Sequence, residues 1–279
     1  MFDPAYALIP AVIWAFSPIY YKTFMEKFDF LSLNLVRTAT ASAVLLLPAV
    51  AAGFGPGEVP ALLSGVITLG LGDSLFLLSI RETGASVAAP VVYTYVLLVQ
   101  LTAGAVGESV PGANFVAAAM IVAGVFVLSR GGHGKPRAKG IALALGAALA
   151  WTAGQDLIRV STVAGGDPVV VAFSRNAAAA LALGLAVVAT RRGRTWPSSL
   201  SRRELGLILL IIISDLVLGS LLFVYSIAAV GVALTVIITS LSPALTQMLS
   251  KVLGKETPSG RDFGGGALIV AALVIAVAF

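Results

Sequence analysis

Four ionisable side chains lie inside long apolar stretches of this sequence: Arg37, Asp73, Arg175 and Asp215. On insertion scales, an ionised group at the centre of a bilayer costs about 2.5–3.5 kcal/mol, so it is tolerated where it pairs with another charge or faces water. Each aspartate could carry a proton or capture an amine, and each arginine could bind a carboxylate. The structural alternative is that the acids pair with the arginines or with hydroxyls, and that the arginines brace the fold.

A second charged set lies in one predicted helix. Asp156 and Arg159 are three residues apart, which places both side chains on one helical face. This spacing favours an ion pair between the two residues, which would neutralise both charges without any role in binding.

Matched polar positions occur in two other predicted helices. Tyr93 and Gln100 are seven residues apart, as are Ser240 and Gln247, so each pair lies on one face of its helix. Glutamine is costly in an apolar medium unless it is hydrogen-bonded. We predict that the four residues line a polar cavity; the alternative is interhelical hydrogen bonding without a substrate.

The elements that must position these side chains are membrane helices. Of the 279 residues, 58% are hydrophobic and 11% charged, against roughly 45–50% and about 25% in soluble proteins. A helix that spans a bilayer needs about 20 apolar residues. The long apolar runs are rich in Leu and Ala, and they predict an all-α membrane protein of ten transmembrane helices: residues 6–24, 31–53, 60–80, 86–107, 112–129, 140–163, 168–189, 204–230, 233–254 and 260–279.

The two halves of the chain resemble each other. The segments Gly72–Phe76 and Gly219–Phe223 are similar and lie 147 residues apart, and the same shift relates Gly84 to Gly231. Five helices per half is an odd number, so the second copy must enter the membrane in the opposite orientation. We predict two inverted five-helix repeats, residues 1–133 and 138–279, in one transmembrane domain, a plan common in secondary transporters.

Two tryptophans follow the same repeat. Trp14 and Trp151 lie in the first helix of each half, with small residues around them. Tryptophan is enriched at membrane interfaces, but both residues lie too deep in their predicted spans for that belt. We therefore expect Trp14 and Trp151 to form walls of the predicted cavity, with interface anchoring as the alternative.

Several segments together resemble the drug/metabolite transporter superfamily, in its EamA-type ten-helix branch. They are the tryptophan of the first helix, Arg37 near the start of the second, "GLGDSLFLLSIRETGAS" and "VGESVPGANFVAAAMIVAGVFVL". In that family a Gly-Glu pair follows the fourth helix of each half. Here the first copy is Gly107-Glu108, whereas the second reads Gly254-Lys255-Glu256 with the acid one place later. The resemblance implies transport of amino acids, other metabolites or drugs.

Several kinds of chemistry are excluded or disfavoured by composition. The chain has no cysteine and a single histidine, His133, so thiolate sites and histidine-clustered metal sites are excluded. We expect no catalytic residue, no metal and no cofactor, and no Gly-rich phosphate loop with Lys is present to bind ATP. Gly70–Asp73 does match the Gly-x-Gly-Asp of intramembrane aspartyl proteases, but no partner aspartate precedes it within a span.

Loop charge predicts the orientation. Apart from Arg37, Arg159 and Arg175, all Lys and Arg residues fall on the face opposite the two termini. Lys and Arg are retained in cytoplasmic loops, so we place both termini outside, in the plasma (inner) membrane. The net charge of +5 then reflects these loops and contact with lipid, not nucleic acid.

Together these patterns predict a secondary transporter or facilitator that works as a monomer by alternating access. The expected substrate is a small molecule, and amino acids or related compounds, moved by export, are the first choice on the family resemblance. A multidrug exporter is the alternative within the class, and an intramembrane aspartyl protease using Asp73 is the alternative from another class.

Overall fold

The computed structural model describes residues 5–24, 27–130, 137–190, 200–252 and 260–279. Over these residues the regular elements are all helical. The longer helices are α1 (Ala5–Phe24), α2 (Phe30–Ala52), α7 (Gly112–Ser129), α8 (Ala138–Val163), α9 (Pro168–Thr190) and α14 (Gly260–Ala278). The shorter ones are α3 (Glu58–Ser64), η1 (Gly65–Gly72), α4 (Asp73–Thr83), α5 (Ala85–Val92), α6 (Tyr95–Thr102), η2 (Ala103–Val106), α10 (Arg202–Ile212), η4 (Ile213–Gly219), α11 (Ser220–Val230), α12 (Val232–Thr239) and α13 (Ser242–Val252).

Over the described residues the predicted segments are helical, with ends that differ by a few residues, but four are not continuous α-helices; the predicted end at Gly254 and the Gly254–Glu256 motif lie outside the described residues. Residues 58–83 and 202–230 each contain a π-helical segment, η1 and η4. Residues 85–106 and 232–252 are each broken near the middle, between α5 and α6 and between α12 and α13. Hydrophobic periodicity did not reveal these irregularities, because the spans are apolar on most faces and a local change of phase is not visible in such a pattern.

The break before α13 has a visible cause. Pro243 has no backbone N–H, so it cannot continue the ladder to the carbonyl of Thr239. The hydroxyl of Ser242 donates to that carbonyl at 2.7 Å and to the carbonyl of Ala11 in α1 at 3.0 Å. The interruption is thus satisfied by a side chain and, at the same time, attaches α13 to α1.

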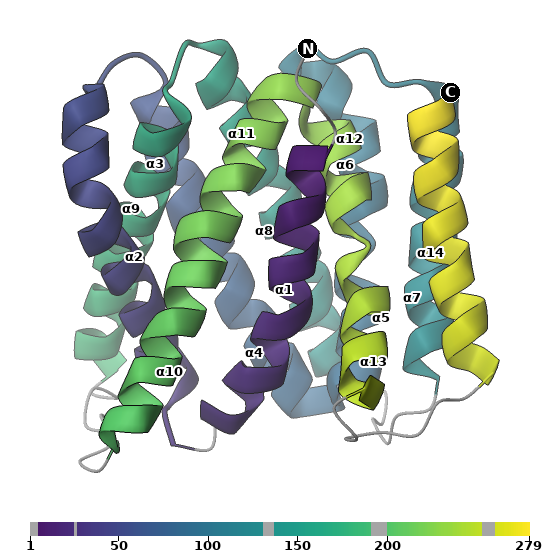
Figure 1. Cartoon of the computed structure of the whole chain (residues 1–279), viewed down its shortest axis with the longest axis horizontal. Helices are drawn as coiled ribbons and strands as arrows, with labels where there is room; N and C mark the ends of the chain where they lie inside the picture. The colour runs from purple at the N-terminus through teal and green to yellow at the C-terminus, as the bar shows by residue number, and fades with distance from the viewer. Residues whose placement is uncertain (1–4, 25–26, 131–136, 191–199, 253–259) are drawn as a thin grey trace.

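The helices stand side by side as a bundle, and the start of α1 and the end of α14 lie at the same end of it (Figure 1). Among the described residues, eight segments are long and apolar enough to span a membrane, and 6–17 and 263–278 are shorter apolar helices. Large apolar side chains such as Leu47 (77% exposed) and Val188 (77% exposed) point outward, as expected toward lipid. The chain is an all-helical, multi-pass membrane protein.

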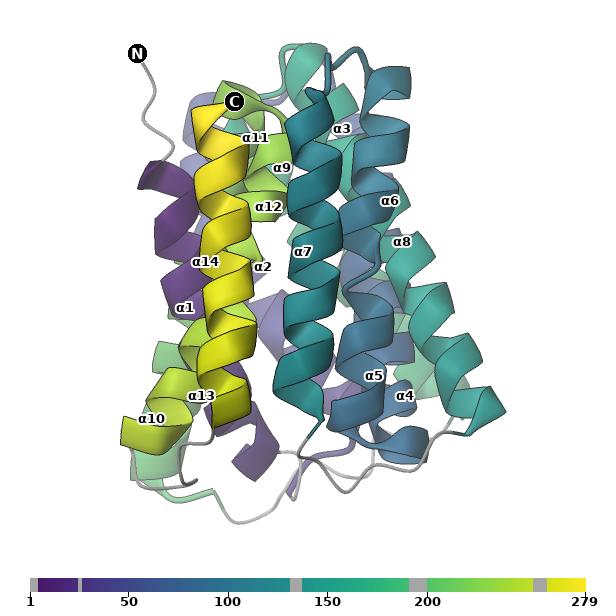
Figure 2. The same ribbon diagram turned by 90° about the vertical axis from the view of Figure 1, so that its right-hand side faces the viewer.

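Helices from the two halves are interleaved. The first helix of the second half, α8, packs against η1 and α3 to α6, whereas α1 packs against η4 and α11 to α13. Helix α2 lies along α9, and α7 lies along α14 (Figure 2). At the second contact, a Cβ on Gly124 would lie 2.9 Å from the carbonyl oxygen of Gly265, so only small residues allow this approach.

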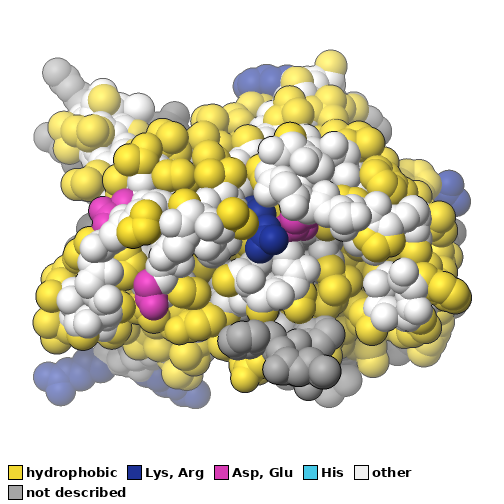
Figure 3. Space-filling view, turned by 90° about the horizontal axis from the view of Figure 1, so that it is seen from above, with side chains coloured by type: hydrophobic (Ala, Val, Ile, Leu, Met, Phe, Trp, Pro, Cys, Tyr) yellow, Lys and Arg dark blue, Asp and Glu magenta, His cyan; other side chains and the backbone are white. Residues whose placement is uncertain are grey.

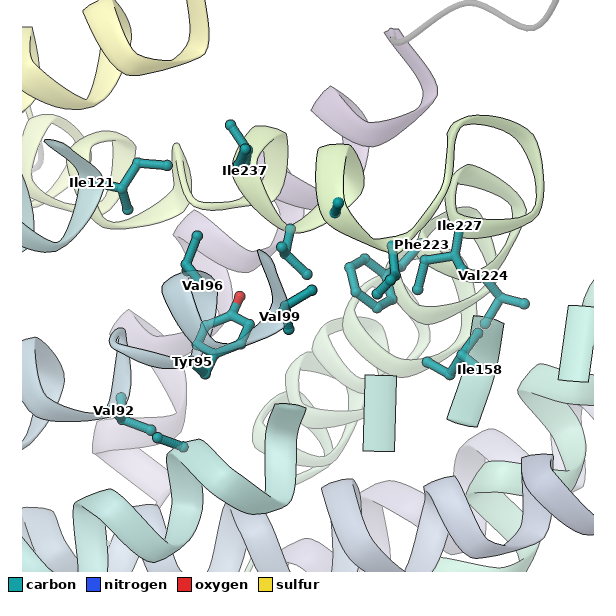
Figure 4. Packing of buried hydrophobic residues seen from close by; sticks show 14 of the residues in the cluster. Val92, Tyr95, Val96, Val99, Ile121, Ile158, Phe223, Val224, Ile227 and Ile237 are labelled. Carbon is teal, nitrogen blue, oxygen red and sulfur yellow. The ribbon is translucent and has the colours of Figure 1, made fainter. Parts of the chain in front are cut away.

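The main apolar core lies where helices from the two halves of the chain meet. Figure 4 shows Val92 of α5 and Tyr95, Val96 and Val99 of α6 together with side chains of the neighbouring helices. Those neighbours are Ile121 of α7, Ile158 of α8, Phe223, Val224 and Ile227 of α11, and Ile237 of α12. The core therefore joins residues far apart in the sequence and fixes the positions of the broken helices.

Candidate functional site

Arg37 lies between the two intramembrane aspartates. Its Nη2 is 2.9 Å from Oδ2 of Asp215, and its Nη1 is 3.8 Å from Oδ2 of Asp73. Arg37 also donates to Oδ1 of Asn34 at 3.2 Å, and Asn34 donates to the carbonyl of Leu69 in η1 at 2.7 Å. The side chains of Arg37 and Asp215 are only 13% and 5% exposed. A charge shared among α2, α4 and η4 thus lies inside the bundle.

The π-helical segments position the two aspartates. Asp73 directly follows η1, and Asp215 lies within η4. A π-helical turn is wider than an α-helical one and rotates the residues that follow it, and such turns occur frequently at functional sites. The two segments are related by the shift of 147 residues, but the acids are not, since Asp73 corresponds to Ser220 and Asp215 to Thr68.

The two tryptophans make matched contacts at the ends of these segments. A Cβ on Gly72 would lie 2.5 Å from the ring of Trp151, and a Cβ on Gly219 would lie 3.0 Å from Nε1 of Trp14. The ring centroids of Trp151 and Phe76 are 5.4 Å apart, and those of Trp14 and Phe223 are 5.1 Å apart. Each tryptophan therefore packs on the π-helical segment of the other half of the chain.

The hydrogen bonds of the two indoles differ. Nε1 of Trp151 donates to Oδ1 of Asp73 at 3.1 Å, whereas Nε1 of Trp14 donates to the backbone carbonyl of Asp215 at 3.4 Å. Trp151 alone therefore binds a carboxylate directly, with a charge-assisted hydrogen bond. The two indoles differ because the position that corresponds to Asp73 in the second half is Ser220, and the position that corresponds to Asp215 in the first half is Thr68.

Arg175 is only 3% exposed, which makes it the most buried of the four intramembrane charged residues. Its Nε donates to the hydroxyl of Ser64 at 3.0 Å, and its Nη1 donates to the hydroxyl of Ser220 at 3.3 Å. Among the residues that the structure describes, no carboxylate forms an ion pair with it. Its guanidinium is thus held by neutral hydroxyl groups in this conformation.

The four residues predicted to line a cavity lie in different surroundings. Gln100 is 2% exposed, and its Nε2 donates to the carbonyls of Val96 and Ala233, both at 3.1 Å. Ser240 is fully buried and donates to the carbonyl of Val236 at 2.6 Å. In this conformation both therefore make backbone hydrogen bonds, and that of Gln100 reaches across to α12.

The other two predicted residues are less buried. Tyr93 is half-buried and stacks edge-on against Tyr95, with 5.9 Å between ring centroids, and Gln247 is also half-buried. Tyr95 in turn packs edge-on against Trp151 at 5.4 Å. Tyr95 thus links α6 to Trp151 and, through it, to Asp73, a role that the seven-residue spacing of Tyr93 and Gln100 did not indicate.

The expected ion pair between Asp156 and Arg159 is not formed. Arg159 instead pairs with Glu108, with Nε 2.7 Å from Oε1. Glu108 lies in the connection between η2 and α7, next to α8 and the start of α12, so it reaches Arg159 from another part of the chain. The Gly-Glu pair was visible in the sequence, but its partner was not, because neighbours three residues apart in one helix are the only partners that spacing reveals.

The grouping of the acidic side chains bears on metal binding. In the described part of the chain, no cluster of three or more His, Cys, Asp or Glu side chains could hold a metal ion. A guanidinium, not a second carboxylate, is the nearest charged partner of Asp215. The described side chains of this centre form ion pairs and hydrogen bonds through arginine, aspartate and hydroxyl groups.

The fold has a relative among solved structures. One, described as "Crystal structure of protein", superimposes with a TM-score of 0.83 at 20% identity, over 98% of this chain and 96% of that chain. No curated protein matches this sequence.

The family comparison covers both halves. The EamA-like transporter family matches twice, at residues 4–130 and 138–278, and both matches include the helices that carry the arginines, aspartates and tryptophans described above. Two matches that together span nearly the whole chain place this membrane protein, with its paired buried charges, in the EamA-like transporter family.

Proposed function

We propose that this chain is a secondary transporter of a small metabolite, with amino acids or related compounds as the first substrates to test and export as the direction. It works by alternating access as a monomer of ten spans, in two inverted repeats, residues 1–133 and 138–279. The observation that carries the proposal is Arg37 held between Asp73 and Asp215, at the place where the two halves meet. Buried charges that exchange partners are a recurring feature of transport pathways.

The surroundings of this centre suit a zwitterion. Arg175 offers a guanidinium whose hydrogen bonds go to hydroxyls, and Asp73 offers a carboxylate bound by Trp151 and Arg37. A substrate carboxylate would replace the hydroxyls at Arg175, and a substrate amine would compete with Arg37 for Asp73. Trp14 and Trp151 would then flank the apolar part of the substrate.

A multidrug exporter is the alternative within the class. A lipophilic cation would use the aspartates and the aromatic walls and would have no need of Arg175. Replacement of Arg175 by Gln therefore separates the two substrate classes. Loss of amino-acid binding in the Gln variant, with partial retention in Arg175→Lys, supports the carboxylate role, whereas cation binding that survives unchanged supports the alternative.

Orientation and membrane follow the loop charge. The start of α1 and the end of α14 share one end of the bundle (Figure 1), and basic residues that the structure describes, such as Lys27, Arg130 and Lys139, lie at the other end, after α1 and α7 and at the start of α8. The positive-inside rule then places the termini outside, in a plasma (inner) membrane. A terminal reporter that is active only in the cytoplasm tests this assignment and should be inactive.

The main test is transport by the purified protein in proteoliposomes. A thermal-stabilisation screen of amino acids, nucleosides and amphiphilic cations selects the substrate. Asp73→Asn and Asp215→Asn are then compared with the wild type. If either aspartate carries the coupling proton, its Asn variant loses flux driven by a pH gradient and keeps counterflow exchange. Gradient-driven flux that is unchanged in both variants would refute proton coupling and leave a facilitator.

A further inference from the structure

A second charged group lies away from Arg37, at the end of the bundle that holds the start of α1 and the end of α14. The carboxylate of Glu108 accepts hydrogen bonds from the backbone N–H groups of Val232 at 2.6 Å and Ala233 at 3.1 Å. Its Oε1 is also 2.7 Å from Nε of Arg159. The Glu108 side chain is only 8% exposed. One carboxylate thus joins the α6–α7 connection to α12 and α8.

The start of α12 is shaped to receive this carboxylate. Gly231 has a φ of +87°, a value that favours glycine, and the turn directs the first N–H groups of α12 toward Glu108. A Cβ at Gly231 would lie 2.6 Å from Oε1 of Glu108. A carboxylate at a helix N-terminus satisfies unpaired N–H groups and complements the helix dipole. The contact is therefore close, specific and charge-assisted.

Arg159 supports the contact from the side. Its Nη1 donates to the carbonyl of Ile227 near the end of α11 at 3.2 Å, while its Nε pairs with Glu108. A pocket of about 320 Å³ opens over the pair and is lined by Gly107, Glu108, Ser109, Arg159 and residues 228–231. Figure 3 looks onto this end and shows a basic side chain beside an acidic one near the centre of the face. Solvent can therefore approach the pair from this side.

The contact joins two helices that pack mainly against different neighbours. Helix α8, which carries Arg159, packs mainly with η1 and α3 to α6, whereas α12 packs with α1, α11, α6, α7 and α14 and only slightly with α8. Glu108 and Arg159 therefore join α12 to α8 at this end of the bundle. At the same end, the hydroxyl of Ser161 in α8 donates to the carbonyl of Gly57 at 2.7 Å, just before α3. The Glu108 contact, not the Ser161 contact, must break if α12 moves away from α8 here.

We propose that Glu108, positioned by Arg159 and seated on the Gly231 turn, is the gate that keeps the terminal end of the transport pathway closed. The contact breaks when this end opens and forms again when it closes. The inference goes beyond the proposed transport function, because it concerns how one side is sealed. Its test needs no substrate, so its failure and the failure of the substrate assignment are distinguishable.

The test uses a single-cysteine reporter in this cysteine-free chain. Ser240→Cys places a thiol on a fully buried residue of the α12–α13 break. A membrane-impermeant methanethiosulfonate is applied to oriented proteoliposomes from the terminal side or from the basic side. Glu108→Gln is compared with the wild type, and Ser109→Ala, an exposed neighbour that lines the same pocket, is the matched control.

The gate predicts a change on one side only. The Gln variant loses the ion pair and one charge-assisted acceptor, so labelling from the terminal side should rise about tenfold or more, since losing a buried charge contact shifts a two-state equilibrium at least that far. Labelling from the basic side should fall or stay the same, and Ser109→Ala should label like the wild type. An unchanged rate from the terminal side, or an equal rise from both sides, overturns the proposal.

A second variant tests the gate if Glu108→Gln does not fold. In Glu108→Cys/Val232→Cys/Gln247→Cys, without the Ser240 reporter, a short reducible cross-linker between the first two thiols closes the contact covalently, and labelling of the Gln247→Cys thiol is the readout. Cross-linking should abolish labelling from the terminal side, and a reductant should restore it. A cross-linked protein that still opens to that side identifies the contact as a static brace and overturns the gate.

Discussion

Removing Arg37 should destabilise this protein more than removing either of its acidic partners. Arg37→Met keeps most of the side-chain volume but leaves Asp215, 5% exposed, and Asp73, 19% exposed, without the guanidinium between them. Breaking a buried ion pair by deleting one partner costs about 3–5 kcal/mol, because the remaining charge is uncompensated. Asp215→Asn leaves Arg37 with Asp73 3.8 Å away and with Asn34, so its cost should be only about 1–3 kcal/mol.

The double variant distinguishes pairing from simple packing. Arg37→Met/Asp215→Asn removes one positive and one negative charge together, so it should be more stable than Arg37→Met alone, by about 1 kcal/mol or more. The assay is reversible unfolding in mixed micelles with increasing denaturing detergent, followed by tryptophan fluorescence. If Arg37→Met costs no more than Asp215→Asn, or if the double variant shows the sum of the single losses, the charge centre is not a coupled set and the reasoning is refuted.

Three further predictions test the surroundings of this centre. Gly72→Ala should lower stability by about 1–3 kcal/mol, since the new Cβ would meet the ring of Trp151 at 2.5 Å, whereas Gly104→Ala, with open space around its Cβ, should not; thermal unfolding checks both. Trp151→Phe should slow transport and Trp14→Phe should slow it less, because only Trp151 donates to a carboxylate; initial uptake rates measure this, and equal effects would contradict it. Single cysteines at the four predicted cavity positions should react with a small aqueous thiol reagent, and substrate should slow the reaction; the positions are Tyr93, Gln100, Ser240 and Gln247. If all four resist the reagent in every condition, they are contacts between helices.

The sequence predicted the helices well because their signal is long and redundant. Eight of the described segments are apolar runs of 18 or more residues, and the runs predicted at 112–129 and 168–189 match α7 and α9 to within one residue. The π-helical segments η1 and η4 could not be predicted from periodicity, since these spans are apolar on most faces and a shift by one residue leaves no visible break in the pattern. They matter because they direct the residues that carry the charges.

The sequence also did not reveal which charged side chains pair with each other across the bundle. The sequence singled out Arg37, Asp73 and Asp215 as costly charges, and cost alone does not say which acid faces which arginine. The pairing of Arg159 with Glu108 depends on how α8 packs against the other helices, which no local spacing encodes. The repeat offered one signal, since Gly84 and Gly231 align, and their φ angles are +85° and +87°. The turn at Gly231 is the one that receives Glu108.

The symmetry of the contacts and the asymmetry of the charges have different physical consequences. Trp14 on Gly219 and Trp151 on Gly72 are equivalent contacts, so each half packs against the other in the same way at this level of the bundle. The acids break that equivalence, because the positions that correspond to Asp73 and Asp215 are Ser220 and Thr68. Arg37 therefore has two carboxylate partners and Arg175 two hydroxyl partners. A bound anion at Arg175 would restore the balance between the halves, so we expect substrate occupancy to shift the conformational equilibrium through this residue.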